Sequence, residues 1–231
     1  MRKNKVMRVA SALLVAVLLS TCAISGTFAK YVTTASGTDT ARVAKWGVDI
    51  DIVSGSGFSN EYKTHDNKYS GAVSVKSFDD AKVVAPGTSS ADVNGDVTFT
   101  ITGKPEVAVK VDILFEAKNE IKLAAGTYLD YTTANDKADE FKLDEEYYPV
   151  KFTLAKDGSN VVTDGTLADV AKALTEASAY YGPNSDTLAT TYTLTWKWDF
   201  NGNDKADTYL GNETTLQSLA YDLSITVTQV D

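Results

Sequence analysis

The densest run of side chains that could hold a cation follows the most aromatic segment of the chain. Oxygen-bearing side chains recur there at nearly alternate positions, as Asp199, Asn201, Asn203 and Asp207. Carboxylate and amide oxygens at this spacing are typical of a loop that binds Ca²⁺. The sixth position, however, is Asp204 where such loops need Gly, and the twelfth is Leu210 where they need Glu. Two interpretations stay open, a calcium site and a polar connection with local turns.

The chain has few of the residues on which catalytic sites usually depend. It contains one histidine, His65, and one cysteine, Cys22. A zinc peptidase needs a ligand set such as His-Glu-x-x-His, which a single histidine cannot supply. A Ser/His/Asp triad would have to use His65, and no Gly-x-Ser-x-Gly motif accompanies it. The sequence therefore predicts a protein that is not an enzyme and that has no cofactor, calcium being the exception left open.

The first 29 residues have the pattern of an export signal. Four basic residues open the chain without an acidic neighbour, and an almost wholly apolar or small run follows over 9–24. A basic start, an apolar run and a small-residue exit are typical of a secretory signal peptide. Thr27 and Ala29 place small residues at the −3 and −1 positions. We therefore expect signal peptidase to cleave between Ala29 and Lys30.

Two alternatives to this cleavage are an uncleaved membrane anchor and a lipoprotein. An uncleaved membrane anchor needs about 20 apolar residues, whereas polar and small residues over 20–27 shorten the apolar run. The stretch from Leu19 to Cys22 loosely resembles a lipoprotein box, but Thr21 departs from the Gly, Ala or Ser usual before that cysteine. The signal-peptide interpretation leaves a mature chain without cysteine, so the exported domain must depend on its hydrophobic core.

The mature chain is strongly acidic. The whole sequence has 22 Lys and Arg residues against 31 Asp and Glu residues. The signal contains four of the basic residues and none of the acidic ones, so the mature chain has a net charge of −13. Such a surface repels nucleic acid and anionic lipid. We therefore expect no nucleic-acid partner, and contact with a membrane only through the signal peptide before cleavage.

Alternating apolar residues predict about eight β-strands. The clearest runs cover 46–52, 97–101, 107–115, 150–154, 192–200 and 221–227, with shorter ones at 72–77 and 83–85. The break Gly103-Lys104-Pro105 separates two of these runs and predicts neighbouring strands. The chain from 118 to 149 is less regular, and the acidic stretch within it is interpreted as solvated surface. Residues 201–212 are interpreted as a polar connection.

One helix is clear from the spacing of its apolar residues over 166–180. Thr166 can cap its start, with Asp169 three residues later, and Gly182-Pro183 is expected to end it. Alternation in the remaining elements favours antiparallel sheets with one wet face. The sequence therefore predicts an all-β fold with minor α content. We expect an antiparallel two-sheet sandwich of jelly-roll type, with one or two helices in its connections, formed by 30–231 as a single domain.

Several motifs resemble one family of secreted proteins. The exit of the signal, 25–29 (SGTFA), is similar to that of substrates of the W-type bacterial signal peptidase. The stretch 84–89 (VAPGTS) is similar to a Pro-Gly-Thr stretch that follows an early strand in the TasA/camelysin family. The runs 195–200 (TWKWDF) and 223–229 (LSITVTQ) resemble the closing strands of that family. The resemblance covers the signal and most of the mature chain, with a departure between Lys118 and Tyr181.

This resemblance implies a jelly-roll subunit that a Gram-positive bacterium secretes. Such subunits form fibres in the biofilm matrix or on the cell surface. The implied partners are further copies of the same chain, and the signal peptidase during export. Some members of the family carry a metallopeptidase label, which the single histidine does not support chemically. We therefore expect an extracellular structural protein.

The segment 30–44 is a candidate donor strand for such fibres. It is rich in Thr, Ala and Ser, lacks strong alternation, and is freed at its front end by the predicted cleavage. An extended peptide can add a strand to the open edge of a neighbour's sheet. Tyr31, Val32 and Val43 are the side chains that we expect to fill pockets in the acceptor. Head-to-tail donation does not close on itself and therefore builds a filament. A disordered tail is the alternative.

Two other functions stay open. The 12 Tyr and 3 Trp residues are compatible with an adhesin or binding module, although most of them fall on predicted core faces. A secreted metallopeptidase is the second alternative, and it depends on the family label alone.

Overall fold

The computed structural model describes residues 43–54, 57–63, 74–132, 139–185 and 188–230. The chain divides into two compact units, Met1–Val43 and Ala44–Asp231, and the described residues belong almost entirely to the second. The signal peptide, the predicted cleavage site at Ala29 and Lys30, and most of the donor candidate lie outside them. His65 is outside them as well.

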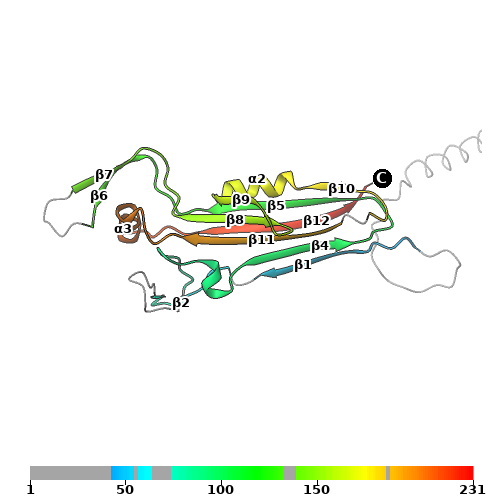
Figure 1. Cartoon of the computed structure of the whole chain (residues 1–231), viewed down its shortest axis with the longest axis horizontal. Coiled ribbons are helices and arrows are strands. Elements are labelled where there is room, and N and C mark those ends of the chain that lie inside the picture. Colours follow the sequence, from blue (N-terminus) through cyan, green and yellow to red (C-terminus); the bar gives the residue numbers. More distant parts are fainter. Residues whose placement is uncertain (1–42, 55–56, 64–73, 133–138, 186–187, 231) are drawn as a thin grey trace, which may run out of the picture. The chain divides into compact units, whose positions relative to one another are not determined.

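Among the described residues, five antiparallel strands form the larger sheet, in the order β1-β4-β11-β8-β9. Their bounds are Val48–Ser54 for β1, Val97–Gly103 for β4, Ala189–Trp198 for β11, Val150–Lys156 for β8 and Ser159–Gly165 for β9. The smaller sheet has the order β10-β5-β12, also antiparallel. Its strands are Ala179–Tyr181 (β10), Val109–Asn119 (β5) and Ala220–Gln229 (β12). The predicted all-β, antiparallel fold is confirmed (Figure 1).

Smaller elements complete the described part of the chain. Two short antiparallel pairs are β2 (Glu61–Lys63) with β3 (Ser74–Lys76), and β6 (Gly126–Asp130) with β7 (Asp139–Leu143). The helices are η1 (Ser90–Val93, a 3₁₀ helix), α2 (Leu167–Glu176) and α3 (Asp204–Asn212). No helix among the described residues is long and apolar enough to cross a membrane.

Alternate residues of the two sheets meet in one hydrophobic core. Phe99 of β4, Phe152 of β8, Val109 of β5 and Trp196 of β11 are all 5% exposed or less. The opposite face of the larger sheet is polar, and threonines of β4 and β11 lie side by side there. The hydroxyl oxygens of Thr100 and Thr191, for example, are 3.2 Å apart. The sequence alternation is therefore the alternation between core and surface that a sandwich needs.

The runs 97–101 and 107–115 are not neighbours in one sheet, contrary to the expectation from the short break between them. β4 belongs to the larger sheet and β5 to the smaller one, so the break carries the chain across the core. Gly103 has φ +152°, and a Cβ there would lie 2.1 Å from the Gly47 carbonyl oxygen. Only glycine fits this close crossing. Such crossings between sheets are typical of jelly-roll chains.

The predicted helix over 166–180 is shorter than expected. Its start is confirmed, because Thr166 and Asp169 form a capping box in which each side chain accepts from the other's backbone N–H. The helix ends at Glu176, because Ala179–Tyr181 pairs with β5 instead of continuing the helix.

Other elements were missing from the sequence interpretation. The irregular segment 118–149 contains β6 and β7, and the polar connection 201–212 contains α3. Helix α3 buries Ala206, Asp207 and Leu210 on one face, and this pattern is too short and polar to identify from spacing alone. Strand β9 was missed because exposed residues dominate it. The predicted strand over 83–85 is only an isolated bridge between Val83 and Ser59.

Candidate strand-acceptor site

Strand β1 is one of the two edge strands of the larger sheet, and β9 is the other. It pairs with β4 over its whole length, and among the described residues β4 is its only partner (Figure 1). Lys45, before β1, exchanges hydrogen bonds with Glu106: its N–H donates to the Glu106 carboxylate at 2.9 Å, and its carbonyl accepts from the Glu106 N–H at 3.0 Å. The start of β1 is thus fixed, while its outer side is paired with no strand in the described part of the chain.

The core-facing side of β1 is incompletely covered. Ile50 pairs with Ile101 and Ile52 pairs with Phe99, so both isoleucines share a face with the core residues of β4. Ile101 and Phe99 are 3% and 1% exposed, whereas Ile50 is 36% and Ile52 is 46% exposed. The alternating pattern therefore predicts the strand correctly, but the core-facing side chains of β1 are not fully buried.

Strand β12 shows the same incomplete cover in the smaller sheet. It pairs with β5, and the two strands place their apolar residues on the same side. The β5 residues Val111, Ile113 and Phe115 are buried, whereas the β12 residues Leu223, Ile225 and Val227 are only half-buried. Among the described residues, β12 has no second neighbour.

Helix α2 explains why only one side of the core is incomplete. It packs against β5, β8 and β9, and so covers the side of the sandwich where β9 lies. Figure 1 shows α2 and β9 along one side of the sheets and β1 along the other. Strand β12 lies on the β1 side of β5, since β10, which follows α2, pairs with the other edge of β5. We call the residues Ile50, Ile52, Leu223, Ile225 and Val227 the open core side.

One end of the open core side is closed by an aromatic contact. Phe58 lies 5.2 Å from Trp196 of the larger sheet and 6.4 Å from Tyr221 of the smaller sheet, measured between ring centroids. The indole N–H of Trp196 donates to the Gly57 carbonyl at 2.7 Å. The two sheets are therefore linked at this end, and the apolar residues beyond it lie between two sheet edges.

The open core side offers what an added strand needs. An unpaired sheet edge has N–H and C=O groups free for a further ladder, and alternate apolar side chains can fill the space between the sheets. Asp49 and Asp51 are exposed on the other face of β1. Charged residues on an edge strand discourage unspecific edge-to-edge pairing.

The donor candidates are placed only in part. Tyr31 and Val32 lie outside the described residues, and Val43 is 67% exposed. The sequence predicts a half-buried strand over 46–52, but it does not indicate that the apolar residues Ile50 and Ile52 stay partly exposed. The alternation was the same as in the covered strands, so only the place of β1 at a sheet edge distinguishes them.

The predicted calcium ligands lie around the start of α3. Asp199 follows β11, and its carboxylate is 3.5 Å from the Lys197 ammonium group. Asn201 is exposed, Asn203 directly precedes α3, and Asp207 is buried in the first turn. The predicted loop is therefore interrupted by a helix after Asn203. Among the described residues, no group of three or more His, Cys, Asp and Glu side chains is placed to hold a metal ion.

Asp207 has a structural partner. The Tyr147 hydroxyl donates to its Oδ1 atom at 2.6 Å, which ties α3 to the segment before β8. Burial raises the pKa of Asp207, and burial followed by the hydrogen bond to Asp207 raises the pKa of Tyr147. A neutral phenol thus satisfies this carboxylate, and calcium binding at the loop stays a prediction.

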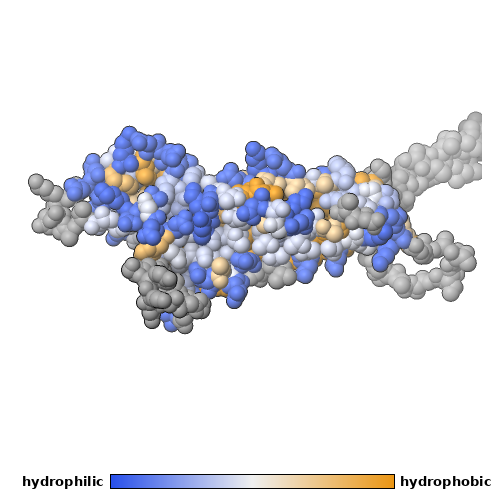
Figure 2. All heavy atoms as spheres, viewed as in Figure 1, coloured by the Kyte–Doolittle hydropathy of each residue, from blue (hydrophilic) through white to orange (hydrophobic). Residues whose placement is uncertain are grey.

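The surface outside these sites is mainly polar. Figure 2 shows hydrophilic residues over most of the face in view, with apolar residues in small separate patches. No protein-family model matches the chain, and no curated protein matches it.

Proposed function

We propose that this protein is a secreted structural subunit that assembles into fibres by strand donation. The segment 30–44 of one copy would add to the open core side of the next. The observation that supports this most directly is the exposure of Ile50 and Ile52, which face the core yet keep 36% and 46% of their area accessible. A complete sandwich would bury both, as β4 buries its own residues.

The partner of this site is a second copy of the same chain rather than an unrelated peptide. The donor candidate is rich in small and β-branched residues and lies shortly before β1 in the sequence. Because the proposed donor and acceptor belong to one chain and face different neighbours, repeated donation gives an open filament. The motifs that resemble the TasA/camelysin family support the same proposal.

The signal-like first 29 residues support an extracellular site of action, in the matrix or on the cell surface of a Gram-positive bacterium. The net charge of −13 for the mature chain favours solubility of the subunit before assembly.

Electron microscopy and sedimentation of two purified chains test this proposal. Residues 30–231 should form fibres, whereas residues 44–231, which retain the compact unit but lack the donor, should stay monomeric. A synthetic peptide of residues 30–44 should bind to the shorter chain and stop the growth of fibres from the longer one. Fibres formed by residues 44–231, or a longer chain that stays monomeric at high concentration, would refute strand donation.

A further inference from the structure

A pocket of about 300 Å³ lies where β6, α3 and the loop after α3 meet. Its lining residues are separate in sequence from the open core side, and β6 and α3, near which they lie in the chain, are at one end of the sheets (Figure 1). Its lining residues are Tyr131, Tyr209, Asn212, Glu213, Thr214 and Thr215. The volume is at the lower end of the range for ligand pockets, about 300–1,000 Å³, so it suits a single small unit or the end of a longer chain.

One wall of the pocket is aromatic. The rings of Tyr131 and Tyr209 are stacked, with centroids 5.9 Å apart and an interplanar angle of 25°. Tyr209 is held in place by Tyr128 and Phe141, whose ring centroids are 4.9 and 6.4 Å away. Tyr131 keeps 47% of its area exposed. The wall is thus a supported aromatic surface with one accessible ring.

An ion pair fixes this aromatic wall. The Lys205 ammonium group of α3 lies 2.6 Å from the carboxylate of Asp130, whose side chain is fully covered. Hydrogen bonds with Lys205 first, and then with Thr132, lower the pKa of Asp130 to about 2. Because Asp130 directly precedes Tyr131, this pair holds the end of β6 against the helix that carries Tyr209.

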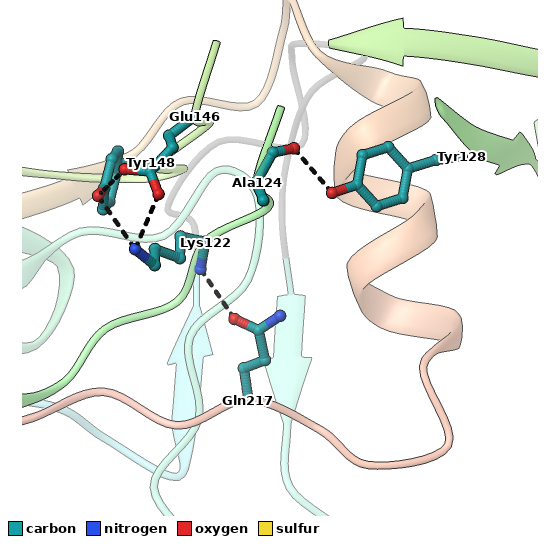
Figure 3. A network of polar contacts seen from close by, with 6 residues as sticks. All are labelled: Lys122, Ala124, Tyr128, Glu146, Tyr148 and Gln217. Carbon is teal, nitrogen blue, oxygen red and sulfur yellow. Dashed lines mark hydrogen bonds and ion pairs between the residues drawn. The ribbon is translucent and has the colours of Figure 1, made fainter. Parts of the chain in front are cut away.

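The other wall is polar and presents acceptors. Glu213 Oε2 accepts from the Gln217 amide at 3.0 Å, and the Gln217 carbonyl oxygen accepts from the Lys122 backbone N–H at 2.8 Å (Figure 3). The Asn212 amide nitrogen donates to the Thr208 carbonyl at 2.8 Å. The second carboxylate oxygen of Glu213 and the amide oxygen of Asn212 have no partner among the described residues.

A wider network holds this loop. Lys122 also contacts Glu146 at 3.0 Å and the Tyr148 hydroxyl at 3.5 Å, and the Tyr128 hydroxyl donates to the Ala124 carbonyl at 2.7 Å (Figure 3). The segment 122–124 is therefore linked both to the loop after α3 and to the aromatic wall. The two walls of the pocket are positioned before any ligand arrives.

We propose that this pocket binds a sugar unit of a polysaccharide, either neutral or carrying an amino group. Aromatic ring faces pack well against the apolar C–H face of a sugar ring, and a supported ring loses little freedom on binding. The free oxygens of Glu213 and Asn212 are acceptors, which match donors such as the hydroxyl or ammonium groups of a sugar. The Glu213 carboxylate and the net charge of −13 disfavour sugars that carry carboxylates.

Calorimetric titration of the secreted chain, residues 30–231, tests this site. The probes are tetrasaccharides of glucosamine, of glucose and of galacturonic acid. We expect binding of the first or the second and none of the third. Tyr131→Ala should weaken that binding about tenfold or more, because the accessible ring supplies the stacking surface. Tyr180→Ala is the matched control, since Tyr180 is 71% exposed on β10, in a different part of the domain.

The circular dichroism spectra of both variants must match that of the parent chain, which shows that they are folded. A third variant, Glu213→Gln, tests the loop after α3. This change should weaken the glucosamine probe more than the glucose probe, because it removes the charge that attracts an ammonium group. Binding of none of the tetrasaccharides, preferential binding of the galacturonic acid probe, or equal binding by Tyr131→Ala and Tyr180→Ala would overturn the proposal. Fibre assembly is measured separately and does not depend on this outcome.

Discussion

Replacing Ile50 and Ile52 together by threonine should weaken assembly without unfolding the subunit. Complete burial of an isoleucine side chain contributes about 1.5–3 kcal/mol. Scaled by their exposed fractions of 36% and 46%, the two residues would gain about 1.2–2.5 kcal/mol when a donated strand covers them. Threonine keeps the β-branched shape that strands favour but loses much of this apolar area.

We expect the double variant to lose about 1–2 kcal/mol of contact free energy per donated strand, which raises the critical concentration for fibre growth roughly five- to thirty-fold. Sedimentation of residues 30–231 over a concentration series measures this value directly. Leu114→Thr is the control, because Leu114 is 60% exposed on β5 but points away from the core. The same critical concentration in the parent and the double variant, or an equal rise in the control, would refute the assignment of the open core side.

Three further changes test the packing of the domain. Thr166→Ala removes the cap of α2 and should lower the free energy of unfolding by about 1 kcal/mol, as measured by urea denaturation; an unchanged midpoint would contradict the capping box. Tyr147→Phe removes the phenol that donates to the buried Asp207 carboxylate and should cost about 1–3 kcal/mol in the same assay, whereas an unchanged free energy of unfolding would contradict the stabilising role of this hydrogen bond. Lys205→Met should make the free energy of unfolding depend less on pH in the acidic range. The pKa of Asp130 is lowered from 3.8 to about 2 in the folded protein. The ionised Asp130 carboxylate therefore stabilises the folded state fully above pH 3.8, and this stabilisation is lost as the pH falls towards about 2. Thermal unfolding between pH 5 and pH 2, run on the variant and its parent, measures the difference, and identical pH profiles would refute the ion pair.

Much of the fold follows from local sequence. The aromatic run over 192–200 and the alternation over 107–115 could only be half-buried strands, since period-2 patterns place apolar residues on one face. The start of α2 follows from Thr166 and Asp169, which satisfy backbone N–H groups within one turn. The shorter elements could not be predicted in this way. Helix α3 and strand β9 owe their conformation to the elements against which they pack, because few of their residues are apolar.

The tertiary structure decided which strands are neighbours and which apolar faces are covered. The runs 97–101 and 107–115 are adjacent in sequence, yet Gly103 sends them into different sheets. Ile50 and Ile52 have the same pattern as buried strands, and only the position of β1 at an edge leaves them exposed. Likewise, Tyr131 and Tyr209 are 78 positions apart in the sequence, and the Asp130–Lys205 pair brings them into one wall. Alternation in the sequence shows which face of a strand is apolar. Whether another element buries that face depends on contacts between residues far apart in the sequence, which no local pattern determines.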